Sequence, residues 1–105
     1  MKINILGTEY QVVTDNDLIE DNLDGCCYPF LKELRVRPVE NLGSRDSTAQ
    51  EKQMIYNEVL RHEAIHAMFW ESGIADWYDN EDLTDWIAKQ FPKMAKIFEQ
   101  LGCEG

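Results

Sequence analysis

The segment from Thr48 to Ser72 constrains this chain most, because it has no glycine or proline and contains both histidines of the sequence. Thr48 and Glu51 have the spacing of a capping box, which begins a helix. We therefore expect a helix from Thr48 to Ser72. Residues four apart lie on the same face of a helix, so His62 and His66 would direct two imidazole rings toward one point.

The two histidines fall within an apolar part of this segment. Ile55, Val59, Ile65 and Phe69 form a stripe at helical spacing, and Leu60, Ala64, Ala67 and Met68 make the opposite side apolar too. A helix that is apolar on nearly every side is expected to lie between other elements, with its histidines pointing inward. Two buried imidazoles present four nitrogens that need partners. A metal ion with surrounding acceptors satisfies all four, whereas a lone core histidine usually bonds a carbonyl.

The residues His62-Glu63-Ala64-Ile65-His66 resemble the H-E-x-x-H motif of zinc peptidases, the zincins. That resemblance implies a Zn²⁺ ion held by both histidines, with Glu63 as the general base for the attack of water on a peptide bond. The longer metzincin motif requires glycine and histidine where this chain has Phe69 and Ser72. The sequence therefore excludes that class.

A third metal ligand is expected among the acids after the helix. The run Asn80-Glu81-Asp82-Leu83-Thr84-Asp85 resembles the N-E-x-x-[ST]-D motif of gluzincins, which implies Glu81 as the third ligand and Asp85 as the partner of a histidine. Glu81 and Asp85 would also share one helix face. Asp82 or Asp85 is the alternative ligand. Another interpretation is that these acids simply favour the helix dipole. The remaining candidates are Asp76 and Asp79, and the cysteines Cys26, Cys27 and Cys103, which lack metal-ligand spacing.

The order of these segments resembles the small ImmA/IrrE-like zincins of phages and mobile elements. Their E-x-x-A-x-x-F-A signature corresponds here to Glu81-x-x-Thr84-x-x-Ile87-Ala88. The resemblance implies an α+β fold, a small zincin-like domain with a short N-terminal β-sheet, made of a hairpin and an edge strand, before two ligand-bearing helices. It also implies a bacterial host cell and a regulatory protein, such as a phage repressor, as substrate.

Length and composition predict one domain over residues 1–105, since 44% hydrophobic residues can form a core, though a marginal one. We expect no membrane segment and no secretory leader. Three cysteines give no even disulfide framework, which favours the cytoplasm. The net charge of −10 argues against nucleic acid as a partner. A peptide or protein substrate remains, and nothing indicates the oligomeric state.

The residues before the helix predict a sheet. Apolar residues alternate on both sides of Gly7, which predicts a hairpin; they are Ile3, Ile5, Tyr10 and Val12. The region from Gly25 to Val36 is expected to supply the strand before the helix. Leu34 and Val36 alternate with charged residues there, which predicts either an exposed edge strand that accepts an extended peptide or simply a solvated strand.

Residues after Gly73 predict a second amphipathic helix with an apolar stripe of Leu83, Ile87, Phe91, Met94, Phe98 and Leu101. Pro92 is expected to kink or split this helix, or to begin a new one. Aromatic residues gather near the link between the helices, where they would either line a cleft or, more commonly, cap the core. They are Trp70, Trp77, Tyr78 and Trp86.

Two functions remain open from the sequence. The first is a zinc-dependent peptidase, favoured by Glu63, since a purely structural metal site needs no base. The second is a catalytically weak or inactive zinc-containing regulatory or binding module. The second is favoured because no residue can be assigned to stabilise the oxyanion. Tyr28, Tyr56, Tyr78, an arginine or the metal alone would have to do so.

Overall fold

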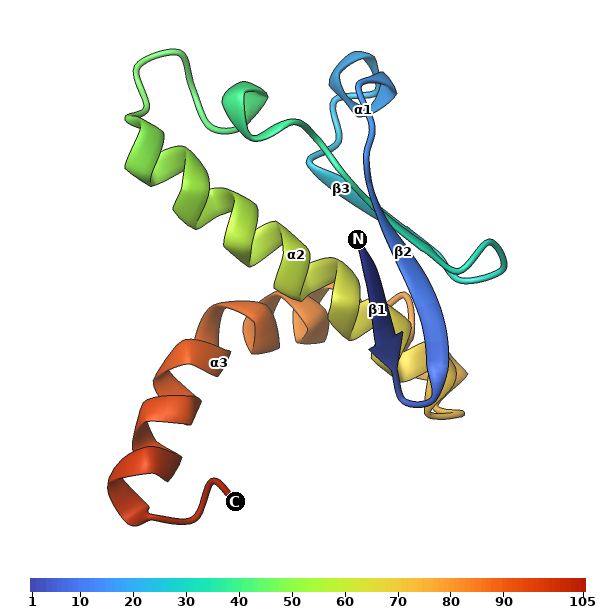
Figure 1. Ribbon diagram of the computed structural model, residues 1–105, viewed down its shortest axis with the longest axis vertical. Coiled ribbons are helices and arrows are strands. Elements are labelled where there is room, and N and C mark those ends of the chain that lie inside the picture. The colour runs from blue at the N-terminus through green and yellow to red at the C-terminus, as the bar shows by residue number, and fades with distance from the viewer.

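A small mixed sheet comes first in the chain and two long helices follow it (Figure 1). The computed structural model describes residues 1–105. Its elements are β1 (Lys2–Ile5), β2 (Thr8–Thr14), α1 (Asp17–Glu20), β3 (Gly25–Tyr28), β4 (Glu33–Val36), the 3₁₀ turn η1 (Val39–Asn41), α2 (Ala49–Glu71), the 3₁₀ turn η2 (Ala75–Trp77) and α3 (Glu81–Leu101). The expected α+β class is confirmed.

The four strands lie in the order β1-β2-β4-β3. β1 and β2 form the expected antiparallel hairpin. Leu6 and Gly7 both have positive φ at its two-residue turn, as such tight hairpin turns require. β4 pairs in parallel with β2 on one side and antiparallel with β3 on the other. The region from Gly25 to Val36 therefore contributes two strands rather than one.

The prediction that the strand of Leu34 is an edge strand is wrong. β4 has a hydrogen-bonded neighbour on each side, and the edge strands of the sheet are β1 and β3. The alternation in β4 separates the two faces of the sheet: Leu34 and Val36 are buried, while Arg35 forms ion pairs with Asp15 and Glu33. Such alternation marks a solvated face. It carries no information on pairing within the plane of the sheet, and so could not identify the edge.

Helix α2 begins and ends where the sequence predicts. The Thr48 side chain caps it by accepting a hydrogen bond from the Glu51 backbone N–H at 3.1 Å. Its C-terminal half packs against the sheet, with Ala67 in the main core cluster alongside Tyr10, Cys27 and Leu34. The other side of this half faces α3. The expected sandwich of α2 between other elements therefore holds for the half that contains the histidines.

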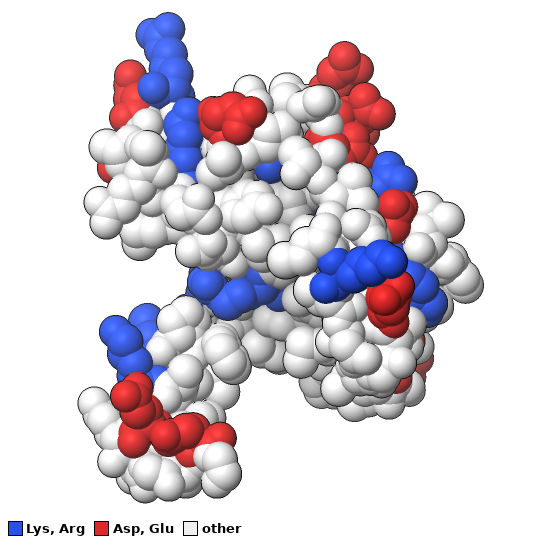
Figure 2. Space-filling model, in the orientation of Figure 1, with Lys and Arg blue, Asp and Glu red and all other residues white.

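Helix α3 is continuous through Pro92, so of the predicted alternatives the split and the new helix are wrong and only the kink remains. The helix bends partway along its length in Figure 1, and its only buried residues are Thr84 and Ala88. The C-terminal half stands apart as a separate lobe in Figure 2. Large apolar residues such as Phe91 and Leu101 are exposed there. Neither long helix contains a stretch apolar enough to cross a bilayer.

Candidate metal centre

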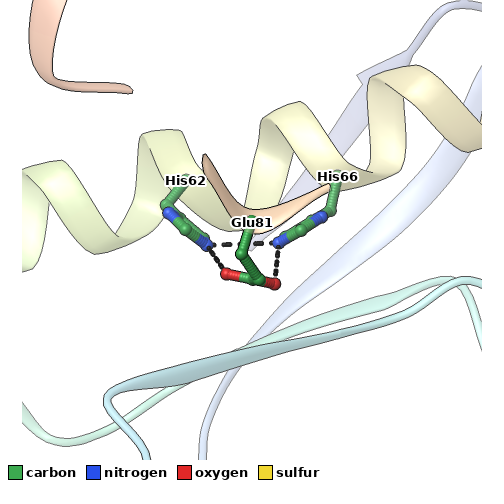
Figure 3. A group of neighbouring side chains, drawn as sticks. All are labelled: His62, His66 and Glu81. Atoms are coloured by element: carbon green, nitrogen blue, oxygen red, sulfur yellow. Dashed lines mark hydrogen bonds and ion pairs between the residues drawn. The ribbon is translucent and has the colours of Figure 1, made fainter. Parts of the chain in front are cut away.

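Three side chains converge where α3 begins beside the middle of α2 (Figure 3). His62 Nε2 and His66 Nε2, one turn apart on α2, lie 3.1 Å from each other. Glu81, the first residue of α3, reaches both histidines. Its Oε2 is 3.0 Å from His62 Nε2 and its Oε1 is 2.9 Å from His66 Nε2. The structure thus brings together the three residues that the sequence assigns as metal ligands.

The start of α3 is fixed by its own cap and by close packing. The Asn80 side chain accepts a hydrogen bond from the Leu83 backbone N–H at 3.0 Å, which ends the link from α2 and begins the helix at Glu81. Thr84 and Ala88, one and two turns further on, are fully buried. Their small side chains allow the backbones of α2 and α3 to approach closely. Glu81 is therefore held beside α2 although its side chain is 69% exposed.

The outer nitrogens of both imidazoles face acceptors. His66 Nδ1 hydrogen-bonds the backbone carbonyl of Tyr78, and because a carbonyl only accepts, the proton lies on Nδ1. His62 Nδ1 lies 3.7 Å from Asp85 Oδ1. This is an ion-pair separation rather than a hydrogen bond, and Asp85 also accepts from Lys89 Nζ at 2.9 Å. Both rings are thereby oriented with Nε2 toward Glu81.

This arrangement of acceptors suits a metal ion. With its proton on Nδ1, His66 directs a lone pair from Nε2 toward His62 Nε2 and the Glu81 carboxylate; the same tautomer of His62 would direct a second lone pair to this point. A cation satisfies all three groups at once. Tetrahedral ligands 2.0–2.2 Å from zinc lie about 3.3–3.6 Å from one another, a few tenths of an ångström more than the separations of 2.9 to 3.1 Å found here. Two imidazoles and one carboxylate are also a donor set typical of zinc with an open fourth position.

Glu63 lies next to this group on α2 and is 7% exposed. Burial, and to a smaller extent the negative charge of Glu81, raises its pKa to about 8. The backbone of β3 lies directly against it at Gly25, where a Cβ atom would be only 3.0 Å from Glu63 Oε2 and 2.7 Å from Val59 Cγ1. A carboxyl group whose pKa lies near neutral pH is suited to accept a proton and to return it.

A cleft of about 730 Å³ opens over these residues. It is bordered by the edge strand β3, by α2 from Ile55 to His66, and by the start of α3. Six acidic side chains line it and Lys89 is its single basic one; the acids are Asp24, Glu58, Glu63, Asp79, Glu81 and Asp85. The candidate base and the three candidate ligands therefore face one accessible space.

The other candidates from the sequence lie elsewhere or have partners. Asp79, Asp85 and Cys26 line the cleft, but none belongs to the group that could hold a metal. Asp76 and Asp82 are exposed outside it, and Cys27 is in the core. Cys103 is exposed near the C-terminus.

Of the residues considered for the oxyanion, only Tyr78 lines the cleft. Its hydroxyl donates to the Cys27 carbonyl at 3.0 Å. Among the other aromatic residues, Trp70 packs edge-on against Tyr78, whereas Trp77 and Trp86 are exposed. Of the four aromatic residues near the link between the helices, Tyr78 therefore lines the cleft and Trp70 packs against it.

Two contributors to the site were not found from the sequence. The Tyr78 carbonyl orients His66, and a backbone atom gives no signal in the choice of residue. Gly25 permits the close approach of β3 to Glu63. A glycine at the start of a strand is a weak signal on its own, and its role here depends on contact with α2, far along the chain.

Comparison with protein-family models, with curated proteins and with solved structures gave no match to this chain. The chemistry of the site therefore follows from its own geometry.

Proposed function

We propose that the protein is a zinc-dependent peptidase, in which His62, His66 and Glu81 hold the metal and Glu63 is the general base. The observation that carries this proposal is the convergence of three acceptor groups beside a buried carboxyl group in one cleft. A structural metal site would account for the three ligands. It would not account for Glu63, whose burial beside Glu81 is unfavourable.

The residues of the chain divide the proposed reaction between them. A bound zinc ion would lower the pKa of water toward ~7 and polarise a carbonyl group. Glu63 would accept the proton of the attacking water and pass it to the leaving amine. The Tyr78 carbonyl and Asp85 would keep the imidazoles oriented with Nε2 toward the ligand position.

The edge strand offers a place for an extended peptide. β3 is unpaired on its outer side and borders the cleft next to Glu63. A substrate could add to it as a further strand, with main-chain hydrogen bonds supplying affinity. This assigns to β3 the substrate-binding role that the sequence suggested for β4. We further propose, from the resemblance to ImmA/IrrE-like proteins, a regulatory protein in a bacterial cytoplasm as the substrate.

The test combines metal binding with turnover. Protein freed of metal by a chelator should take up one zinc ion per chain, and His62→Ala and His66→Ala should each abolish that uptake. A broad peptide library should be cleaved by the zinc-loaded wild type. Glu63→Gln should retain zinc and lose at least about 100-fold of the turnover. Glu58→Gln is the matched control, because Glu58 lines the same cleft on the same helix.

One observation favours the second candidate, a zinc-containing binding or regulatory module without turnover. The Tyr78 hydroxyl is engaged by the Cys27 carbonyl, and no arginine lines the cleft, so only Lys89 or the metal would be left to stabilise an oxyanion. A wild type that binds one zinc ion and cleaves nothing in the library would establish this alternative. A wild type that binds no zinc would exclude both.

A further inference from the structure

Pro92 leaves one carbonyl of α3 without its helical donor. In an α-helix the N–H of residue 92 would donate to the C=O of residue 88, and proline has no N–H. Ala88 is fully buried, so solvent does not replace that donor easily, and an unpaired buried carbonyl is costly. Arg61 of α2 supplies it instead: its Nε donates to the Ala88 carbonyl oxygen at 2.8 Å.

Few other contacts fix α3 on the molecule. Among the helices and strands, α2 is its principal neighbour. Its two buried residues, Thr84 and Ala88, are small, so little apolar area anchors the helix. Glu81 sits two turns before Ala88 at an end of the helix where its side chain is mostly exposed. The angle at which α3 crosses α2 at Ala88 therefore determines the position of the Glu81 carboxylate relative to His62 and His66.

We propose that Arg61 is a positioning residue of the metal centre. It binds the carbonyl that Pro92 frees, and thereby fixes α3 so that Glu81 meets His62 and His66. Arg61 immediately precedes His62, so Arg61 and the two histidine ligands lie on consecutive turns of α2. The inference rests on the metal site of the proposed function but not on its catalysis.

The pairing also explains how a proline is tolerated within α3. A kinked helix can expose a free carbonyl to a neighbouring element, and a charged donor satisfies such a group better than a neutral one. The guanidinium is planar and permanently charged, so its Nε–H has a fixed direction once the side chain is packed. Arg61 is half-buried between the two helices, which favours that fixed direction.

The first test replaces Arg61 by methionine, which keeps an extended side chain but has no donor. Zinc affinity, measured by competition with a chromophoric chelator, should fall about 10–100-fold, the range seen when groups that orient ligands are lost. Amide hydrogen exchange of residues 84–91 in the metal-free protein should accelerate, while exchange in the sheet stays as in wild type. Arg45→Met, which removes an exposed positive charge in the loop before α2, should change neither quantity.

The second test asks whether Arg61 acts by binding the Ala88 carbonyl that Pro92 leaves without a helical donor. Pro92→Ala restores an N–H that can donate to the Ala88 carbonyl, so Arg61→Met should weaken zinc binding much less in the Pro92→Ala background than in wild type. An equal loss in both backgrounds would overturn the proposal, as would an Arg61→Met protein with wild-type zinc affinity and wild-type exchange in α3. If the wild type binds no zinc, the proposed function fails, and hydrogen exchange of metal-free α3 still decides whether Arg61 anchors this helix.

Discussion

Two carboxylates on α2, Glu63 in its middle and Glu71 at its end, lie in opposite environments. Glu71 accepts hydrogen bonds from Thr8 Oγ1 at 2.9 Å, Tyr10 OH at 2.6 Å and Lys32 Nζ at 2.8 Å. These donors lower its pKa to about 2, with Lys32 contributing most. Glu63 is buried without such help, and its pKa is raised to about 8. Glu71 links the helix to the sheet through its hydrogen bonds, whereas ionisation of Glu63 lowers the stability of the metal-free protein.

The two residues differ in role: Glu71 stabilises the fold, whereas Glu63 belongs to the candidate metal centre. Glu71 connects β2 and the β3–β4 turn to α2 through three donors, so its charge is fully used within the structure. An ionised Glu63 has no compensating group in the protein, and a pKa of about 8 keeps its carboxyl group mostly protonated at neutral pH when no metal is bound. Ionisable groups with strongly shifted pKa values are concentrated at functional sites, and natural proteins tolerate local conflicts mainly there. A cation at His62, His66 and Glu81 would supply the compensation that the protein does not.

The largest effect on stability is expected from removing the satisfied carboxylate. Glu71→Ala leaves the buried Tyr10 hydroxyl and the Lys32 ammonium without their acceptor, and should lower the free energy of unfolding by about 3–5 kcal/mol. Glu99→Ala on the exposed part of α3 should cost less than about 0.5 kcal/mol. Denaturant titration measures both. An equal cost for the two variants would contradict the role given to Glu71.

The same residue predicts a loss of stability in acid. The pKa of Glu71 is lower in the folded protein than the usual 4.5, so its stabilising contribution is present above pH 4.5 and disappears as the pH falls toward about 2. The stability difference between wild type and Glu71→Gln should therefore shrink over that interval. Denaturant titration of both proteins at each pH measures this difference. If it stays constant between pH 5 and pH 2, the charge of Glu71 is not the source of its stabilising contribution.

The unsatisfied carboxylate should behave in the opposite way. The folded-state pKa of Glu63 lies above its usual value, so its ionisation destabilises the metal-free protein progressively as pH rises from 4.5 to about 8. Glu63→Gln should match wild type near pH 4 and be more stable at pH 9 by about 3–5 kcal/mol. Thermal unfolding in the presence of a chelator measures this difference. A Glu63→Gln protein less stable than wild type at pH 9 would reverse the comparison.

A smaller effect is expected at Gly25, which lets β3 lie against Glu63. Gly25→Ala places a methyl group 2.7 Å from Val59 Cγ1 and 3.0 Å from Glu63 Oε2, and such overpacking should cost about 1–3 kcal/mol. Adding Val59→Ala removes the closest contact and should recover part of the loss, as shown by a double-mutant cycle. Cys26→Ala on the same strand is the control. Strict additivity of the two substitutions would contradict this close approach.

The smallest change removes one donor of Glu71. Tyr10→Phe deletes a 2.6 Å hydrogen bond to a charged acceptor and keeps the fully buried ring in place. The expected cost is about 1–2 kcal/mol, with the pKa of Glu71 rising toward its usual value. Urea unfolding measures the loss of stability in Tyr10→Phe, with Tyr56→Phe as the control variant. No loss of stability would mean that Lys32 and Thr8 alone satisfy the carboxylate.

The sequence predicted those parts of the fold that depend on local pattern. The bounds of α2 follow from Thr48 and the absence of glycine and proline up to Ser72, and the β1–β2 hairpin from alternation around Gly7. The parallel pairing of β2 with β4 could not be predicted, because it joins residues separated by α1 and β3. For the same reason the sequence could not distinguish the edge strand β3 from the interior strand β4.

A similar division holds at the site. His62, Glu63 and His66 are set by spacing on one helix, and Glu81 by a short motif at the start of the next, so all four could be named in advance and the structure brings them into one cleft. The contact of Arg61 with Ala88 and the support of Gly25 could not be named. They depend on how α2 meets α3 and β3, and that geometry is not encoded in any one segment.

X-ray diffraction from zinc-soaked crystals, with anomalous data collected at the zinc absorption edge, tests the proposed metal centre most directly. We expect one strong anomalous peak per chain, about 2.0–2.2 Å from His62 Nε2, His66 Nε2 and a carboxylate oxygen of Glu81, with Glu63 adjacent and not bound to the metal. No peak between these residues, or a peak held by other side chains such as Asp79 and Cys26, would contradict this assignment.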